Sequence, residues 1–239
     1  MKVEPLVQGP SRASGRRFRQ DREVSVCRAG ERPAATLLLP SDLRPAALAP
    51  AAPGGTCRVL TDGVVQLDSF SDADIDAAWA GEDDQFVRRS RLPGPFTRRD
   101  IAQRIGDAQR QWGIGGPRHS FAVREAGTRR LVGGCVLETC PDDRKIGELS
   151  YWVFPPYRGR GYATRSAELV CRFAFDDLGM ARVDVLIEPT NEASLRVATR
   201  AGFLRHHHGG NAGGPGVVLF SRLRSEGQRP AWPGSPVRG

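Results

Sequence analysis

The segment 157–164, YRGRGYAT, holds the residues whose types and spacing best fit a chemical role. It stands between an apolar segment and a helical pattern, and a helix that begins directly after a strand leaves its first backbone N–H groups unpaired at the positive end of its dipole. Gly159 and Gly161 would let an oxygen-rich pyrophosphate approach those groups closely. Arg158 and Arg160 would add charge-assisted hydrogen bonds. The segment therefore predicts a phosphate cradle, and an arginine-rich turn that only begins a helix is the alternative.

The spacing separates this segment from two other phosphate-binding loops. It lacks the lysine of GxxxxGK[ST], and Thr164 stands where GxGxxG requires its third glycine. The choice between a cradle and a simple turn therefore depends on the elements on either side.

Those elements are a strand and an amphipathic helix. Residues 145–154, KIGELSYWVF, alternate as a strand that places Glu148 and Trp152 on the same face. Residues 163–178 carry apolar side chains at helical spacing, and Gly179 follows where a left-handed C-terminal cap is expected. The cradle would thus lie at a junction from strand to helix.

The rest of the chain has the element order of a mixed α/β domain. The pairs Ser71 with Asp74 and Thr97 with Asp100 are capping signals for the first two helices. In chain order we expect a hairpin at 58–70, helices at 71–79 and 97–112, strands at 119–125, 130–140 and 181–188, a helix at 191–201, and strands at 203–208 and 216–223.

The net charge of +8 is unevenly spread along the 239 residues. Residues 1–55 hold nine basic and five acidic side chains among proline and alanine tracts, which predicts a disordered basic arm. Residues 56–223 are predicted to fold as one domain and residues 224–239 to form a disordered tail. Because the central part is nearly neutral, we expect no nucleic-acid surface on the fold itself, and an arm that touches RNA or the ribosome is the alternative.

The lack of a recognisable targeting signal and the cysteine usage favour a reducing compartment. The sequence has no apolar run of about eighteen residues and no secretory leader, so we expect no membrane contact. The five cysteines are odd in number and never form CxxC, which argues against a disulfide framework and against a zinc site. A cytoplasmic protein without a metal is the expectation.

Two linked blocks, ELSYWVFPPYRGRGYATRSAELV at 148–170 and LIEPTNEASLRVATRAGF at 186–203, carry a family resemblance. Together they resemble the GNAT superfamily of acyl-CoA-dependent N-acyltransferases, especially the branch of ribosomal-protein N-terminal acetyltransferases. The positions that match the coenzyme A signature [Q/R]xxGx[G/A] are Arg158, Gly161 and Ala163, and those that match the following Asn-x-x-Ser and Gly-Phe are Asn191, Ser194, Gly202 and Phe203.

The resemblance covers residues 57 to about 223 and implies a fold. It implies the α/β (α+β) GNAT fold, a mixed and mostly antiparallel sheet of about six to seven strands flanked by about four helices, with two central strands splayed apart. The pantetheine of coenzyme A would enter that opening and pair with exposed main chain like an added strand.

The resemblance also assigns cofactor contacts, with acetyl-CoA as the acyl donor and no metal. Trp152 and Val153 would supply main-chain groups to the pantetheine, and the turn after them would lie under the pyrophosphate. The implied contact residues are Trp152, Val153, Arg158, Gly159, Arg160, Gly161, Tyr162, Ala163, Thr164, Asn191 and Ser194.

The implied chemistry is direct attack of a neutral amine on the thioester, without an acyl-enzyme. Glu148 is the implied general base, and a surface carboxylate is the alternative interpretation of this residue. Many relatives protonate the departing thiolate with a tyrosine at the position of Ala198, so Ser194 is the substitute candidate. One of the histidines 206–208 near the acceptor cleft, or water, is the other candidate for the base.

These observations predict an acetyl-CoA-dependent N-acetyltransferase that acts on a primary amine. A protein N-terminus, a polyamine, an aminoglycoside-like antibiotic and a small metabolite amine all stay open as acceptors. The charged segment 81–96 would border the acceptor site. A catalytically silent coenzyme A-binding regulatory or interaction module is the alternative function, and a homodimer is left open.

Overall fold

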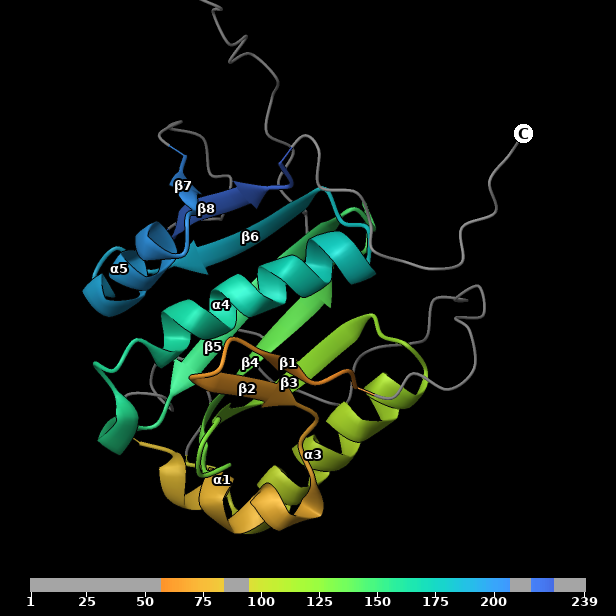
Figure 1. Cartoon of the computed structure of the whole chain (residues 1–239), viewed down its shortest axis with the longest axis vertical. Helices are drawn as coiled ribbons and strands as arrows, with labels where there is room; N and C mark the ends of the chain where they lie inside the picture. Colours follow the sequence, from red (N-terminus) through yellow and green to blue (C-terminus); the bar gives the residue numbers. More distant parts are fainter. Residues whose placement is uncertain (1–56, 84–94, 207–215, 226–239) are drawn as a thin grey trace, which may run out of the picture.

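The computed structural model describes residues 57–83, 95–206 and 216–225. Within these ranges eight strands form one sheet in the order β1-β2-β3-β4-β5-β6-β8-β7 (Figure 1). The pair β5 and β6 is parallel, and every other neighbouring pair is antiparallel. The mixed, mostly antiparallel sheet is therefore confirmed, and its eight strands are slightly more than the six to seven that the family resemblance implied.

The elements follow the predicted order along the chain. The strands are β1 Leu60–Thr61, β2 Val65–Asp68, β3 Arg118–Glu125, β4 Leu131–Thr139, β5 Ile146–Val153, β6 Arg182–Ile187, β7 Leu204–Arg205 and β8 Val218–Leu223. The α-helices of the described residues are α1 Ile75–Gly81, α3 Arg98–Gly113, α4 Tyr162–Arg172 and α5 Glu192–Arg200. Short 3-10 turns, η1 Asp72–Asp74 and η2 Pro155–Tyr157, precede α1 and α4.

The predicted caps begin the first helices. Ser71 and Asp74 form a capping box at η1, which continues into α1. Thr97 accepts a hydrogen bond from the backbone N–H of Asp100, which forms the matching box at α3. Each box satisfies two donors that a helix start would leave unpaired.

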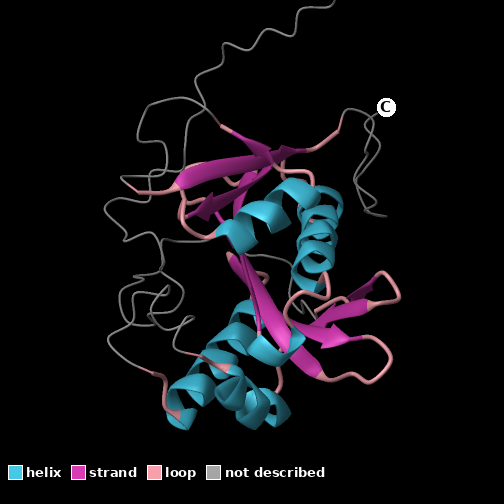
Figure 2. Ribbon diagram, turned by 90° about the vertical axis from the view of Figure 1, so that its left-hand side faces the viewer, coloured by secondary structure: helices cyan, strands magenta, loops and turns pink. Residues whose placement is uncertain are grey.

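The helices cover opposite faces of the sheet. One core cluster packs α4 and α5 against the side chains of Phe121, Leu137 and Leu149. The other packs α1 and α3 against Phe70 and Ala122, with Trp152 half-buried beside it. The side view separates the helices into these two groups (Figure 2). Because strand residues alternate between faces, β5 contributes to both clusters.

The predicted long helix at 163–178 ends earlier as an α-helix than expected. It changes to a π-helix, η3 Phe173–Asp177, where the N–H of Leu178 donates to the carbonyl of Phe173 at 3.2 Å. Gly179 then adopts φ +66°, the left-handed conformation expected of it. The helical spacing of apolar residues predicted the helix and the glycine that follows it. The change from an α-helix to a π-helix does not alter this spacing in a recognisable way, so it was not predicted.

Several predictions concern residues outside the described ranges. The arm 1–55 and residues 226–239 of the tail lie there, while the N–H of Arg224 donates to the carbonyl of Ala181 at 3.0 Å at the edge of the sheet. Cys57, Cys135 and Cys171 are free thiols. Cys140 is disulfide-bonded, which the argument against a disulfide framework did not anticipate.

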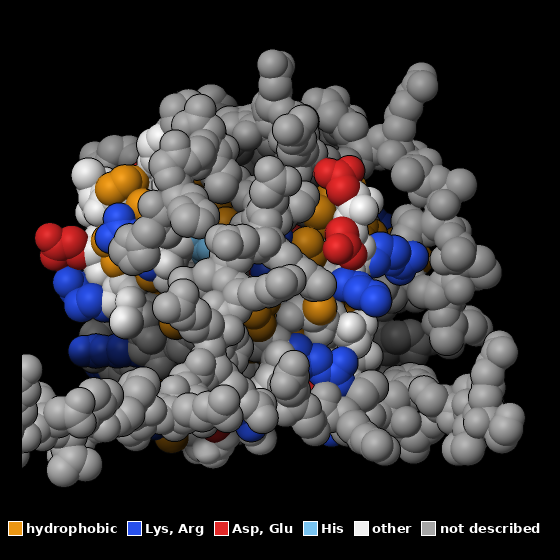
Figure 3. Space-filling view, turned by 90° about the horizontal axis from the view of Figure 1, so that it is seen from above, with side chains coloured by type: hydrophobic (Ala, Val, Ile, Leu, Met, Phe, Trp, Pro, Cys, Tyr) orange, Lys and Arg blue, Asp and Glu red, His pale blue; other side chains and the backbone are white. Residues whose placement is uncertain are grey.

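The described surface carries both signs of charge. Seen from above, acidic and basic side chains of the described residues lie near one another beside hydrophobic ones (Figure 3). None of the helices in the described ranges combines the length and apolar character needed to cross a bilayer.

Candidate active site

An opening between β5 and β6 is the central feature of the site. The two strands pair over three positions, Ile146 with Arg182, Gly147 with Val183, and Glu148 with Asp184. Beyond these positions β5 runs on to Val153 and β6 to Ile187 without further pairing to each other. The predicted splay of the central strands is therefore confirmed.

The backbone of β5 presents alternate residues to this opening. The N–H of Phe154 donates to Val132 of β4 at 2.9 Å, which fixes the even-numbered residues as those that bond to β4. The carbonyl of Lys145 accepts from Ala181 and Arg182, so the odd-numbered residues face β6. Main-chain groups of Leu149, Tyr151 and Val153 consequently point into the opening.

This register changes the role expected for Trp152. Its main-chain groups pair toward Gly134 of β4, and its indole ring lies on the α1 and α3 side of the sheet, stacked at 6.5 Å on Phe70. A side chain at Gly134 would collide with that ring. Trp152 therefore offers a side chain to the face opposite α4.

The predicted cradle lies at the end of the same strand. Gly159 and Gly161 adopt φ +78° and +80°, values that residues with a Cβ rarely adopt. A Cβ at either position would meet no protein atom within 4 Å, so the loop is open to a ligand. Gly161 caps α4, and the N–H of Arg165 is the first to find a helical carbonyl, that of Gly161 at 3.1 Å.

The first turn of α4 supplies backbone N–H groups that could bind an anion. The N–H groups of Tyr162, Ala163 and Thr164 precede the first helical hydrogen bond and carry the positive end of the dipole. The Tyr162 side chain is buried, and its hydroxyl donates to Glu125 at 2.7 Å, which raises its pKa. The side chain thus anchors the helix to β3 while its backbone stays with the cradle.

The two motif arginines differ in their contacts. Arg158 donates from Nε to the carbonyl of Val153 at 2.9 Å and pairs with Asp83 at 2.9 Å. Arg160 is exposed, and its guanidinium lies 5.9 Å from the centre of the Tyr157 ring. Arg160 thus lies near the side chains of Tyr157 and Tyr162, whereas Arg158 bridges two other elements.

The first turn of α5 flanks the other side of the opening. Asn191 accepts a hydrogen bond from the N–H of Ser194 at 3.2 Å, so it caps the helix as predicted. The carbonyl of Ser194 accepts from the Tyr151 hydroxyl at 3.1 Å, and burial raises the pKa of Tyr151. Ala198 is fully buried in the core, where many relatives carry a tyrosine.

Tyr151 contacts α5 beside the opening, and sequence reasoning missed this contact. Alternation placed its side chain on the α4 face, but no local pattern shows that this face borders α5. The contact with Ser194 joins residues 43 positions apart in the chain, so only the tertiary structure reveals it.

Glu148 lies in a row of polar residues that crosses the sheet at the closed end of the opening. It is exposed, and its register partners are Glu138 on β4 and Asp184 on β6. Cross-strand neighbours on one face stand about 5 Å apart, so three carboxylates are adjacent. Asp184 is buried, accepts from Ser221 at 2.6 Å and from Arg182, and has a pKa raised by burial. Each neighbouring carboxylate has an arginine partner, Glu138 with Arg118 at 3.8 Å and Asp184 with Arg182 at 3.0 Å.

Other candidates are only partly covered by the structure. His206 follows β7, and His207 and His208 lie outside the described residues. In the described ranges no group of three or more His, Cys, Asp or Glu side chains is arranged to hold a metal. Of the charged segment 81–96, residues 84–94 are not described.

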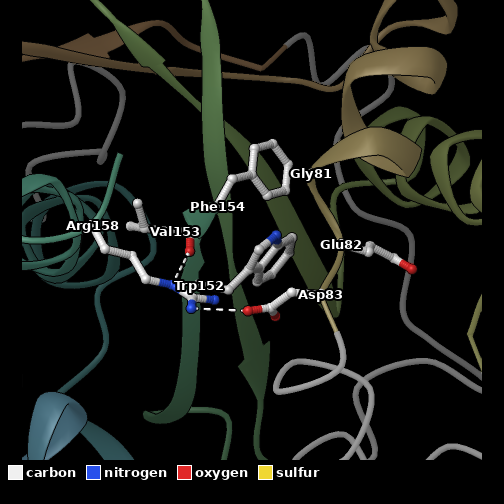
Figure 4. Close-up of a pocket in the computed structure, with 7 residues that line it drawn as sticks. All are labelled: Gly81, Glu82, Asp83, Trp152, Val153, Phe154 and Arg158. Carbon is white, nitrogen blue, oxygen red and sulfur yellow. Dashed lines mark hydrogen bonds and ion pairs between the residues drawn. The ribbon is translucent and has the colours of Figure 1, made fainter. Parts of the chain in front are cut away.

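A small pocket lies where α1 ends against the end of β5 (Figure 4). Its lining includes Asp83, Trp152, Val153, Phe154 and Arg158. Figure 4 shows Asp83 and Arg158 pointing toward one another beside Trp152. The pocket thus adjoins both the opening and the cradle.

The fold with its splayed parallel pair is shared by solved structures. The chain is similar to the ribosomal-protein-S5-alanine acetyltransferase of Vibrio fischeri, with a TM-score of 0.54, 16% identity, and coverage of 70% of this chain and 96% of that chain. At this identity the likeness shows the fold alone.

A family model described as the acetyltransferase (GNAT) domain matches residues 65–204. Because the match spans more than half of the chain, the protein belongs to the GNAT acetyltransferase family, a family of acyltransferases that use acetyl-CoA. The sequence resemblance to this family is thereby confirmed.

Curated relatives support this membership at lower coverage. The chain is 36% identical over 72 residues to the SPbeta prophage-derived uncharacterized N-acetyltransferase YokL of Bacillus subtilis (strain 168), across 29% of this chain and 41% of that protein. It is 23% identical over 141 residues to the uncharacterized N-acetyltransferase p20 of Bacillus licheniformis, across 55% of this chain and 77% of that protein. The match to the first relative thus spans less than half of its length.

Proposed function

We propose that this protein transfers an acetyl group from acetyl-CoA to a primary amine by direct attack. The observation that carries the proposal is the continuity of the opening and the cradle, because β5 leads from main chain that is not paired with β6 to the start of α4 within nine residues, from Val153 to Tyr162. Coenzyme A carries the amides of its pantetheine next to its pyrophosphate, in the same order in which β5 leads to the cradle.

In this proposal the pantetheine enters between β5 and β6. Main-chain groups of Leu149, Tyr151 and Val153 bond to its amides in the manner of an added strand. Ser194 and Asn191 lie along the other side, where Asn191 acts mainly by fixing the first turn of α5. Trp152 contributes its side chain on the face of the sheet opposite α4, where we place the acceptor amine.

The pyrophosphate binds at the start of α4. The N–H groups of Tyr162, Ala163 and Thr164 donate to its oxygens, and Gly159 and Gly161 leave the approach open. Arg158 and Arg160 add charge-assisted hydrogen bonds. These contacts hold the thioester in the opening so that the amine meets it in near-attack geometry.

The reaction forms a C–N bond and breaks the C–S bond of the thioester. Glu148 takes the proton of the attacking amine, directly or through water, and His206 or water alone is the alternative base. Main-chain N–H groups on β5 stabilise the developing oxyanion. The departing thiolate takes a proton from the Ser194 hydroxyl, which regains one from water, or it takes a proton directly from solvent, since Ala198 offers none.

The test is amine-dependent release of coenzyme A thiol from acetyl-CoA. Peptides with free N-termini, polyamines, aminoglycosides and small amines form the acceptor panel. We expect thiol release that depends on an amine of this panel and an acetylated amine of matching amount. Binding of acetyl-CoA without any thiol release across the panel would favour a silent coenzyme A-binding module instead. The cytoplasmic location and the oligomeric state stay predictions.

A further inference from the structure

The three arginines around the cradle differ in whether their charge is paired. Arg158 forms an ion pair with Asp83 at 2.9 Å, and Arg165 forms one with Asp62 at 2.7 Å. Arg160 is exposed and forms no ion pair with any residue that the structure describes. Its guanidinium is therefore available to a ligand.

The Arg160 side chain lies toward the end of β3. Its guanidinium is near the Tyr157 ring and the Tyr162 hydroxyl, and its charge acts on the carboxylate of Glu125. Each oxygen of Glu125 already has a donor, because Oε1 accepts from Tyr162 and Oε2 from Thr128, both at 2.7 Å. Glu125 therefore does not depend on Arg160 for its hydrogen bonds.

Arg130 brings a second cation to the same place. Its carbonyl accepts from the N–H of Glu125 at 3.0 Å, which holds the two residues side by side at the turn between β3 and β4. Arg130 is exposed, forms no ion pair within the described ranges, and its charge also acts on Glu125. Two guanidinium groups near one carboxylate leave the end of β3 with an excess of positive charge.

The end of β3 lies beyond the cradle as seen from the opening. The opening is between β5 and β6, whereas β3 is separated from β5 by β4 on the other side. Tyr162, whose N–H belongs to the cradle, is anchored to Glu125 at this end of β3. A ligand that continues past the cradle, away from the opening, therefore reaches Arg160 and Arg130.

Coenzyme A carries a further phosphate beyond its pyrophosphate. This group is a monoester on the 3′ oxygen of the ribose, and a phosphate monoester has a charge of about −1.5 to −2 at pH 7. A guanidinium binds such a group with paired, charge-assisted hydrogen bonds. The 3′-phosphate thus matches both the position and the charge of the two arginines.

We propose that Arg160 and Arg130 bind the 3′-phosphate of coenzyme A, so that the protein prefers coenzyme A to 3′-dephospho-coenzyme A. Any contact of Arg160 with the pyrophosphate is additional to this one. The inference rests on the proposed acetyl transfer from acetyl-CoA and names a group by which the donor is recognised.

Calorimetric titration of the full-length protein with coenzyme A and with 3′-dephospho-coenzyme A tests the proposal. We expect the wild type to bind coenzyme A at least about tenfold more tightly. Arg160→Gln should reduce this preference to about threefold or less, and combining it with Arg130→Gln should abolish it. The ratio of the two affinities is the readout, because Arg160→Gln also removes charge near the pyrophosphate.

Arg144→Gln is the matched control. Arg144 is exposed in the turn between β4 and β5, at the other end of β5 from the cradle, and it forms no ion pair with a described residue. This variant loses the same charge and should keep the wild-type preference. Thermal denaturation checks the fold of each variant. If Arg160→Gln melts earlier than the wild type, Arg130→Gln alone, which should also lower the preference, carries the test.

The outcomes separate this inference from the proposed function. No binding of either ligand by the folded wild type would overturn both. Equal binding of the two ligands by the wild type would overturn only the 3′-phosphate site. A preference that survives in the combined Arg130→Gln and Arg160→Gln variant, or that is lost equally in Arg144→Gln, would also overturn it.

Discussion

The hydroxyl of Tyr151 donates to the carbonyl of Ser194 at 3.1 Å and thereby joins β5 to α5 across the opening. The two residues lie on the elements that must stay at a fixed separation for a ligand to fit between β5 and β6. The structure thus contains a direct hydrogen bond between the two sides of the proposed pantetheine site.

Tyr151→Phe should loosen this connection without disturbing the core. Because one partly buried hydrogen bond is lost, we expect the free energy of unfolding to fall by about 1 kcal/mol and the KM for acetyl-CoA to rise. Chemical denaturation and steady-state kinetics measure the two effects. Tyr157→Phe is the control, and an unchanged unfolding free energy in Tyr151→Phe would show that the bond has no role in stability.

Gly161→Val tests whether the cradle binds coenzyme A, but the substitution also strains the backbone, so a control with the same strain is needed. Gly179 sits after the other end of the same helical segment with φ +66°, so Gly179→Val introduces comparable strain away from the ligand. We expect both variants to melt at lower temperature, and only Gly161→Val to lose coenzyme A affinity, by tenfold or more, about 1.4 kcal/mol. Equal affinities in the two variants would contradict the assigned cradle.

Glu148→Gln tests the base. Removal of a positioned general base typically slows turnover by about 10² or more. Because Glu148 lies on the face opposite α4, its substitution should leave the affinity for coenzyme A nearly unchanged. The pH dependence of kcat should lose its rising limb in this variant. Glu138→Gln, its register neighbour on β4, is the control and should retain that limb. A kcat that is unaltered across pH in Glu148→Gln would remove the residue from the mechanism.

The buried ring of His119 should make the stability of the protein depend on pH. Its ring is buried against Trp112 and Phe173, and burial lowers its pKa to about 4. Since an unfolded histidine titrates near 6.5, the unfolded chain binds the extra proton between about pH 6.5 and 4, and the free energy of unfolding should fall by up to about 3 kcal/mol as pH drops through that window.

The matching variant is His119→Phe, which keeps an aromatic ring and removes the titration. Denaturation at several pH values should give a shallower fall in unfolding free energy for this variant than for the wild type. Parallel curves for the two proteins between pH 6.5 and 4 would show that His119 is not the group responsible.

Local signals carried much of the fold. The two capping pairs and the left-handed Gly179 depend on residues a few positions apart, and each was recognisable from its spacing. The two-residue strands β1 and β7 lie inside the hairpin at 58–70 and the strand at 203–208 that the residue patterns predicted, whereas the family resemblance implied about six to seven strands in place of eight. The π-helix was missed because its hydrogen bonds, not its apolar spacing, distinguish it.

The site was predictable in one part and hidden in another. The glycines and the start of α4 form a local motif, so their place at the junction from strand to helix was predicted from the sequence, whereas their left-handed conformation was not. The pairing of Arg158 with Asp83 joins residues 75 positions apart, and the direction of the Trp152 main chain depends on its register with β4. Such contacts are set by packing across the sheet and leave no short-range pattern.

Calorimetric titration of acetyl-CoA into the full-length protein tests the central claim most directly, because the opening and the cradle must both be present for the ligand to bind. The account predicts one acetyl-CoA per chain, with binding that Gly161→Val weakens and Gly179→Val does not. A folded protein that shows no heat of binding, or that binds equally well with Gly161→Val, would contradict it.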